Sequence, residues 1–521
     1  MLVAAVAVLP NCAGNNYSPV YERSGDFYWD RVTKNGRSAA IAAYAGESTD
    51  VVIPSRIRLL PVTAIYTNAF SGKNLTSVVI PDTVTRIAAS AFLRNSLTSV
   101  TIPPGVTVIG EAAFANNNLT AVTIPPNVTE IYPSAFNDNK LTSIVFHGGV
   151  TIGERAFAHN LLTSLVIPEG ITTIKSSAFA SNRLSAVTLP ASLTSIESYA
   201  FADNELTEIA VPSGVTKIGD SAFSSNRLTA VSIPDSVTYL GGFNSNRLTD
   251  IAIPAGVTEI GNSAFYGNRL NSVTIPGSVT KIGGSAFSDN LLTAVTIPNS
   301  VIQIDNSAFS GNQLTSVIIP ASITKIGKSV FTYNQLTSVT IPNSVTEIGE
   351  SAFSRNQLAS VIIPAGITEI GDLAFYDNQL TSVTIPNGVT KIGDSAFAYN
   401  QLTSVIIPDS VTEISGSAFS HNRLTDVTIP EGVTFIGPWA FADNRLTRIK
   451  IPDSVTLIIF DAFSGNQWES ISIGSGFDFP GSDSPHSGSG FGSAFDEFYR
   501  AQNRSAGTYT LNGGNWTFQA R

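Results

Sequence analysis

The chain has 521 residues, of which 13% are charged and 43% are hydrophobic, and its formal net charge at pH 7 is −10. Binding to DNA or RNA needs clustered Lys and Arg that displace counterions, and no basic stripe occurs, so nucleic acids are excluded as partners. A single cysteine, Cys12, excludes an internal disulfide and any metal site built from several thiolates.

Residues 1–16 contain an apolar run that is too short to span a bilayer but has the length of the core of a secretory signal. If translation starts upstream of Met1, the stretch resembles the end of a bacterial lipoprotein signal in which Cys12 is lipidated. Asn11 departs from the small residue preferred before such a cysteine, and an ordinary signal or a buried thiol is the alternative. Cys12 is therefore our lipid-anchor candidate and the only predicted route to a membrane.

Residues 17–49 include the stretch GDFYWDRVTKNGRSAAIAAYAG, in which aromatic and alternating residues surround a turn signal at Asn35 and Gly36. This pattern predicts a β-hairpin. We expect it to cap the repeat array that follows, because the end coil of an array otherwise exposes its core and its strand edge to water.

Residues 50–472 repeat a 22-residue phrase. Aligned on the Phe of the recurring Ala-Phe pair, 19 copies run from Phe70 to Phe463, with one spacing of 21 and one of 20. A constant short period means that each unit stacks on its neighbours and does not fold alone. The sequence therefore predicts one β-rich solenoid of about 19 coils.

The copy LTSVTIPNSVTEIGESAFSRNQ, residues 336–357, indicates how a coil is built. Val339 and Ile341 alternate with polar residues, which predicts a short strand that Pro342 ends. The stretch VTEIG predicts a second, shorter extended segment. We expect the stretch ESAF to form a single helical or 3₁₀ turn that carries Phe353 into the core, so that each coil buries about seven side chains.

An Asn follows the core Phe by three residues in 18 of the 19 copies, as at Asn356. Its side chain both donates and accepts hydrogen bonds, so stacked copies are expected to form a ladder that satisfies backbone groups at a tight turn. The alternative is a row of Asn that contacts a glycan or a metal ion.

The pattern L-x-x-V-x-I-P-x-x-V-x-x-I-x-x-x-A-F-x-x-N resembles the leucine-rich repeat, in particular the BspA-like class of bacterial surface antigens. The resemblance covers residues 50–472. It implies a right-handed solenoid with caps, in a secreted or cell-surface protein of host-associated bacteria or of protists, used for adhesion to matrix proteins or cells. It transfers no functional residue to a particular position.

Residues 473–521 begin with a Gly- and Ser-rich stretch that predicts a loop or linker. The stretch AFDEFYRAQN then predicts a short amphipathic helix, and GTYTLNGGNWTF predicts a hairpin that turns at Gly513 and Gly514. We expect a cap that closes the array; a free binding module is the alternative.

The sequence predicts no catalytic, cofactor-binding or metal-binding residue. None of its four histidines pairs with another at the spacing of a zinc-binding helix, and no nucleophile elbow, phosphate-binding loop or dinucleotide fingerprint occurs. His159 and His421 fall on a variable position after the core Phe, which indicates solvated turn residues. We therefore expect a protein that is not an enzyme.

The outward residues of the first strand are mostly small and uncharged, and between Phe309 and Phe419 one outward position alternates between Ile and Thr. Several aromatic residues lie outside the inward set, and exposed aromatic residues favour interfaces. The alternative is scattered surface tyrosines without a ligand. The candidate binding residues are Tyr266, Tyr333, Tyr376, Tyr399, Trp439, Arg448 and Lys450.

Together these features predict a monomeric, non-enzymatic adhesin that binds host matrix or cell-surface proteins without a cofactor. A purely structural spacer is one alternative. An ice-binding protein is another, because Thr follows the repeat Leu in 15 of 19 copies. Those Thr rows are, however, expected to form hydrogen bonds along the stack.

Overall fold

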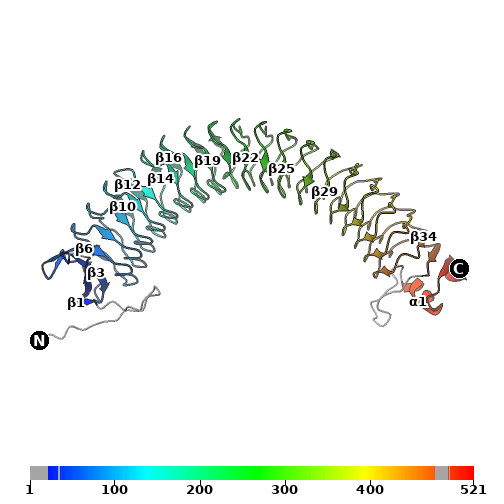
Figure 1. Ribbon diagram of the computed structural model, residues 1–521, viewed down its shortest axis with the longest axis horizontal. Helices are drawn as coiled ribbons and strands as arrows, with labels where there is room; N and C mark the ends of the chain where they lie inside the picture. Colours follow the sequence, from blue (N-terminus) through cyan, green and yellow to red (C-terminus); the bar gives the residue numbers. More distant parts are fainter. Residues whose placement is uncertain (1–20, 33–35, 476–490, 492) are drawn as a thin grey trace. The chain divides into compact units, whose positions relative to one another are not determined.

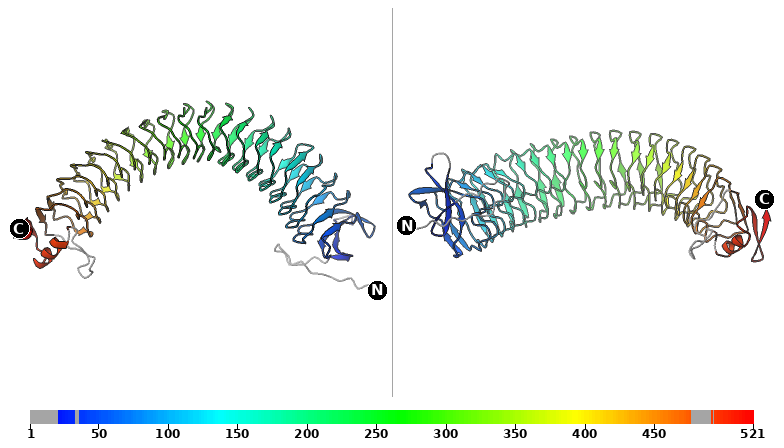
Figure 2. Two further views of the ribbon diagram at one scale, coloured as in Figure 1. Left: turned by 180° about the vertical axis from the view of Figure 1, so that it is seen from behind. Right: turned by 60° about the horizontal axis from the view of Figure 1, so that its bottom comes forward.

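The computed structural model describes residues 21–32, 36–475, 491 and 493–521. Residues 1–248 and residues 249–521 form two compact units. Within each unit the backbone winds through successive coils, and the short strands of one coil lie beside those of the next (Figure 1, Figure 2). The predicted β-rich repeat solenoid is confirmed.

Each regular coil contributes a short second strand, and many coils also contribute a short first strand, which in others is reduced to an isolated bridge. In residues 336–357, β28 (Ser338–Thr340) pairs in parallel with β26 (Ser316–Ile318) of the preceding coil, and β29 (Glu347–Ile348) pairs in parallel with β27 (Lys325–Ile326). Paired residues are one repeat apart, so equivalent side chains of successive coils form straight rows. Strands of two or three residues suffice because neighbouring coils supply their hydrogen-bond partners.

In the first unit, the first strands of the coils form parallel pairs, and the second strands form longer parallel sheets. The first strands are β4 (Asp50–Val52) with β7 (Ser77–Val79), β10 (Ala121–Ile124) with β12 (Ser143–Phe146), β14 (Ser164–Val166) with β16 (Ala186–Thr188), and β18 (Glu208–Ala210) with β20 (Ala230–Ser232). The second strands of one sheet are β6 (Leu60–Ile65), β8 (Arg86–Ile87), β9 (Val108–Ile109), β11 (Glu130–Ile131) and β13 (Thr151–Ile152). The short strand β5 (Arg56–Ile57) pairs antiparallel with β6. The second strands of the next sheet begin with β15 (Thr173–Ile174), β17 (Ser195–Ile196), β19 (Lys217–Ile218) and β21 (Tyr239–Leu240).

The second unit repeats this arrangement. Its other first strands are β24 (Val295–Thr296), which pairs with β26, and β34 (Arg448–Ile451) with β36 (Ser470–Ile473). Its other second strands are β22 (Glu259–Ile260), β23 (Lys281–Ile282), β25 (Gln303–Ile304), β30 (Glu369–Ile370), β31 (Lys391–Ile392), β32 (Glu413–Ile414), β33 (Phe435–Ile436) and β35 (Leu457–Ile458).

The core is a set of apolar rows that run from coil to coil. In residues 336–357, Leu336, Val345 and Phe353 are 0% exposed. The ring of Phe353 stacks between those of Phe331 and Phe375, with 5.6 Å between ring centroids on either side. Burial of apolar surface and stacking of these rings hold the coils together without disulfides, and the predicted interior is confirmed.

The predicted helical or 3₁₀ turn in the stretch ESAF is wrong. Two hydrogen-bonded four-residue turns follow one another there: Ala352 N donates to Gly349 O at 3.2 Å, and Ser354 N donates to Ser351 O at 3.1 Å. Ser351 (φ 58°) and Arg355 (φ 55°) are left-handed, which interrupts any helix. Such residues recur two positions before and two positions after the core Phe along the array, and we call them the first and second left-handed positions.

The predicted Asn ladder is confirmed. Asn356 is 8% exposed, and its Oδ1 accepts a hydrogen bond from Leu336 N at 3.0 Å. Its Nδ2 donates to the carbonyl oxygens of Phe331, Phe353 and Ser354 at 2.9, 3.1 and 3.2 Å. Each Asn therefore ties its own turn to the preceding coil, and the buried polar groups of the turn are satisfied.

Threonines that follow the repeat Leu form hydrogen bonds along the stack in some coils: Thr337 Oγ1 donates to Thr315 O at 3.4 Å, and Thr229 Oγ1 donates to Thr207 O at 3.3 Å. A second Thr row, just before the second strands, does the same, as Thr346 Oγ1 donates to Thr324 O at 3.3 Å. These hydroxyl protons are directed to the neighbouring coil.

An antiparallel meander precedes the coils of the first unit. It consists of β1 (Glu22–Ser24), β2 (Phe27–Arg31) and β3 (Ala39–Tyr44), and β3 joins β6 in parallel. Trp29 on β2 is fully buried, and the Tyr44 ring stacks 5.6 Å from Phe70, which extends the row of core rings. The predicted leader, Cys12 and Asn35 lie outside the described residues.

The second unit ends in the predicted helix and hairpin. Phe491 stacks on Phe463 at 4.8 Å, and α1 (Ser493–Ala501) follows. The hairpin of β37 (Gly507–Asn512) and β38 (Asn515–Ala520) turns at the left-handed Gly513 and Gly514, and β37 pairs antiparallel with β36. The rest of the Gly- and Ser-rich stretch, residues 476–490, lies outside the described residues.

Candidate functional site

The turns after the second strands form one long edge of the second unit. We call this edge, made of the two left-handed positions and the residue directly after the core Phe, the turn edge. A non-glycine residue with positive φ is uncommon in proteins, but here it occurs twice in a coil. Because the intervening Phe is fixed in the core, these positions hold their side chains at the surface in rows that follow the stack.

All five aromatic candidates lie on the turn edge. Tyr333 and Tyr399 occupy the second left-handed position and Trp439 the first, while Tyr266 and Tyr376 directly follow a core Phe. Their exposed fractions are 53% for Tyr333, 47% for Tyr399, 43% for Trp439 and 38% for Tyr266, and Tyr376 is half-buried.

Three of these tyrosines belong to a continuous row of contacts. The guanidinium carbon of Arg355 lies 4.6 Å from the ring centroid of Tyr333 and 6.0 Å from that of Tyr376. The Tyr376 ring meets that of Tyr399 edge-on at 5.3 Å, and the Tyr399 ring stacks on His421 at 4.2 Å. We call these five residues the aromatic row. Cation–π and ring contacts of this kind stabilise side chains that are otherwise free to move.

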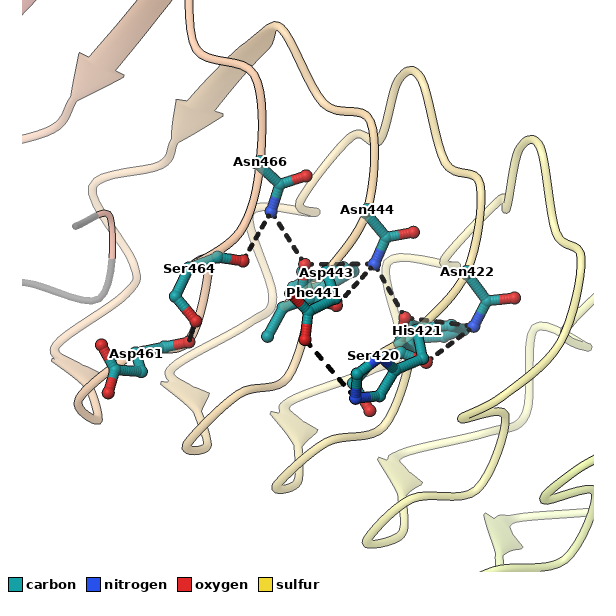
Figure 3. Close-up of polar contacts among 11 residues, drawn as sticks. Ser420, His421, Asn422, Phe441, Asp443, Asn444, Asp461, Ser464 and Asn466 are labelled. Atoms are coloured by element: carbon teal, nitrogen blue, oxygen red, sulfur yellow. Dashed lines mark hydrogen bonds and ion pairs between the residues drawn. The ribbon is translucent and has the colours of Figure 1, made fainter.

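The aromatic row ends at a polar contact between His421 and Asp443, and its backbone is held by the Asn ladder. His421 Nε2 is 3.4 Å from Asp443 Oδ2 (Figure 3). Next to this pair, Asn444 Nδ2 donates to Phe441 O at 3.1 Å (Figure 3). It also donates to Phe419 O of the preceding coil at 2.9 Å. The buried ladder therefore fixes the backbone that carries the exposed side chains.

Sequence reasoning missed Arg355 and His421. His421 was assigned to the solvent as a turn residue, and half of its side chain is indeed exposed, but it is also the last ring of the aromatic row. The signal that could have found both residues is their position two after the core Phe, which they share with Tyr333 and Tyr399.

Tyr266 and Trp439 make other contacts. Tyr266 lies three coils before Tyr333, and its hydroxyl forms a hydrogen bond with the Asp289 carboxylate, which together with the charge of that carboxylate raises the pKa of the Tyr266 hydroxyl. The Trp439 ring meets the exposed Phe460 ring edge-on at 5.0 Å.

The outward residues of the first strands form a second surface, which we call the strand face. Arg448 and Lys450 lie on this face and not on the turn edge. They project from β34 beside a hollow of about 500 Å³ that Asp409 and Asp426 also line. Arg448 pairs with Glu469 and Lys450 with Glu431, each at 3.5 Å. Exposed ion pairs contribute about 0–1 kcal/mol, and here they balance the two positive charges.

The described part of the chain offers little for catalysis. Among those residues, no three His, Cys, Asp or Glu side chains are grouped closely enough to hold a metal ion. His421 and Asp443 are both about half exposed, whereas general acid–base catalysis uses a titratable group placed against a bound substrate. Within the same ranges, no helix is long and apolar enough to cross a membrane.

Comparison with protein families gives one match. The model of the BspA type leucine rich repeat region, six copies long, matches residues 63–185, 150–269, 258–380 and 368–483. These matches overlap and together span most of the array. No curated protein matches the sequence.

Several solved structures are similar in fold. A leucine rich cell surface protein from Faecalibacterium prausnitzii is 28% identical, with 74% of this chain and 93% of the other covered and a TM-score of 0.40. YopM from Yersinia enterocolitica is 18% identical, with 83% and 90% covered and a TM-score of 0.46. The pneumococcal vaccine antigen PcpA is 18% identical, with 86% and 97% covered and a TM-score of 0.36.

Proposed function

Because the chain belongs to the BspA-type leucine-rich repeat family, we propose that it is a secreted or cell-surface, non-enzymatic protein that binds proteins of host matrix or host cells. The family is consistent with a protein-binding role. Adhesion to a host, and location on a bacterial surface with or without a lipid on Cys12, are the further steps of the proposal.

The aromatic row is the observation that supports a protein partner. Tyr and Arg are enriched among the residues that contribute most to protein–protein binding, because they offer large contact areas with few rotatable bonds. In this row each ring or guanidinium is held by the next, from Tyr333 to His421, so little side-chain freedom remains to be lost on binding.

The absence of an enzymatic role is also part of the proposal. The titratable groups of the turn edge and of the strand face are exposed or paired with one another, as in the His421–Asp443 and Arg448–Glu469 pairs. General acid–base catalysis needs a titratable group held against a bound substrate, and these pairs face the solvent instead.

Ice binding is less well supported than protein binding. Regular rows of Thr run along the stack, but hydroxyls such as that of Thr337, which follows a repeat Leu, and that of Thr346 already donate to carbonyl oxygens of the neighbouring coil. A hydroxyl that already donates its hydrogen to a carbonyl oxygen of the protein cannot donate it to ice.

We expect the triple substitution Tyr333→Ser, Arg355→Ser and Tyr399→Ser to weaken adhesion at least tenfold, because it removes three anchors of the aromatic row. A tenfold loss corresponds to about 1.4 kcal/mol, which is what one such anchor commonly contributes. The measurement is binding of the full chain to immobilised fibronectin, laminin and collagen and to epithelial cells.

Tyr199→Ser is the matched control for this experiment. Tyr199 is a left-handed residue of the first unit, is 51% exposed and does not belong to the aromatic row. The control is expected to bind as the parent does. Equal binding by the triple variant would contradict the role of the aromatic row, and no binding by the parent to any of these probes would favour the spacer.

A further inference from the structure

The strand face of the second unit carries large apolar residues that none of the residues described by the structure covers. Ile318, Ile362 and Ile406 are 73%, 83% and 75% exposed, although each lies on a regular first strand or bridge. Exposed apolar side chains in isolation are ordinary, but a straight row of them is not.

These isoleucines alternate with threonines in strict register. Ile318 pairs with Thr296 on one side and with Thr340 on the other, and Thr384 pairs with Ile362 and Ile406. We call residues 296, 318, 340, 362, 384, 406 and 428 the Ile–Thr row. Neighbouring strands are about 4.8 Å apart, so a long side chain recurs about every 10 Å with a short one between.

The surroundings of the Ile–Thr row are uncharged except at its last coil. The outward position two residues before a member is Ala294 or a serine, from Ser316 to Ser404, and these residues are exposed; before Thr428 it is Asp426. Charged outward residues of the second unit's strand face begin only at Asp250 on one side and Asp426 on the other. A partner that covers this face would therefore desolvate no charge until it reached the ends of the row.

We propose that the Ile–Thr row is a self-association surface on which a second copy of this chain docks. Closed pairs of identical chains are related by a two-fold axis, so the surface must be complementary to itself. An alternation with a period of two coils meets that condition: an axis between two adjacent coils sets every Ile opposite a Thr. The long side chains of each copy then fill the gaps above the short side chains of the other.

The size of the row sets the strength of the contact. Seven coils at about 4.8 Å and about four strand residues at 3.3 Å give roughly 400 Å² for each partner. A stable interface buries about 800 Å² for each partner, so the dimer should be weak and reversible. It would be favoured where many copies are held close together, and it departs from the monomer expected from the sequence.

Sedimentation velocity of the full chain tests this inference without knowledge of any ligand. The parent is expected to pass from monomer to dimer as its concentration rises through the micromolar range into the sub-millimolar range. Ile362→Asp should raise the dissociation constant at least tenfold, because it buries an unpaired carboxylate at the centre of the row. A parent that stays monomeric throughout would overturn the proposal.

Two further variants separate interlocking from nonspecific apolar adhesion. Ile302→Asp changes an isoleucine that is 66% exposed in the same unit but lies outside the row, and it should associate as the parent does. Thr384→Ile fills one gap and should weaken association, whereas nonspecific adhesion would become stronger. Stronger association of Thr384→Ile, or a loss with Ile302→Asp equal to that with Ile362→Asp, would refute the interlocking surface.

Discussion

Replacing Phe353 by Ala is expected to lower the free energy of unfolding by about 3–5 kcal/mol. The ring is 0% exposed and stacks on one ring above and one below, so its removal leaves a cavity that interrupts the row of core rings. Urea unfolding followed by tryptophan fluorescence and by amide hydrogen exchange measures the loss, and exchange should rise first in the coils on either side.

Phe353→Leu provides the control for cavity formation. It keeps an apolar side chain of similar length at the same place and should lose clearly less stability than Phe353→Ala. Equal losses for the two variants would mean that the stacked geometry of the ring, and not the volume that it fills, stabilises the coil.

Asn356→Ala is expected to cost about 1–3 kcal/mol. The substitution leaves Leu336 N–H without its acceptor, and an unsatisfied buried group costs about that much, whereas Phe331 O keeps a second donor, Asn334 Nδ2 at 3.2 Å. Gln357→Ala, at the exposed neighbouring position, should change the free energy of unfolding by less than about 0.5 kcal/mol. A small effect of Asn356→Ala in the same urea experiment would contradict the structural role of the ladder.

Asn356→Asp should make stability depend on pH. The introduced carboxyl would face three carbonyl oxygens, which raises its pKa in the folded chain above the ordinary value of about 3.9. A group whose folded pKa is raised stabilises the fold below its unfolded pKa, and that contribution is lost as pH rises through the folded value. The melting temperature of the variant relative to the parent should therefore fall between about pH 4 and pH 7, while Gln357→Glu should show no such trend.

The interior of the coil could be predicted from the sequence because the buried residues recur at regular intervals. Val339 and Ile341 alternate as a strand requires, and Phe353 and Asn356 recur at fixed positions in coil after coil. A single copy does not show which positions are structural. Nineteen copies do, because a residue type that returns at the same position in every coil is required by the stacking of the coils. The buried rows and the Asn ladder follow from that constraint.

The turns could not be predicted in the same way. Ser351 and Arg355 are left-handed although neither Ser nor Arg favours that conformation, so composition gives no signal. The turn is closed by backbone hydrogen bonds, from Ala352 N to Gly349 O and from Ser354 N to Ser351 O, which any residue type can form. Because the sequence does not reveal this turn, it could not predict that Arg355 lies against Tyr333. It also could not distinguish the aromatic candidates that contact one another from those that do not.

The register of the coils has a consequence for changes in length. Identical phrases in a gene recombine, and loss of one complete phrase would leave the interior intact because every coil contacts only its neighbours. The order of Ile and Thr along the Ile–Thr row, however, depends on whether an odd or an even number of coils is lost. Removing the coil that contains Thr384 would bring Ile362 beside Ile406, whereas removing two coils would restore the original sequence of long and short residues. If the interlocking surface is used, variants of this protein should gain or lose coils in this stretch two at a time.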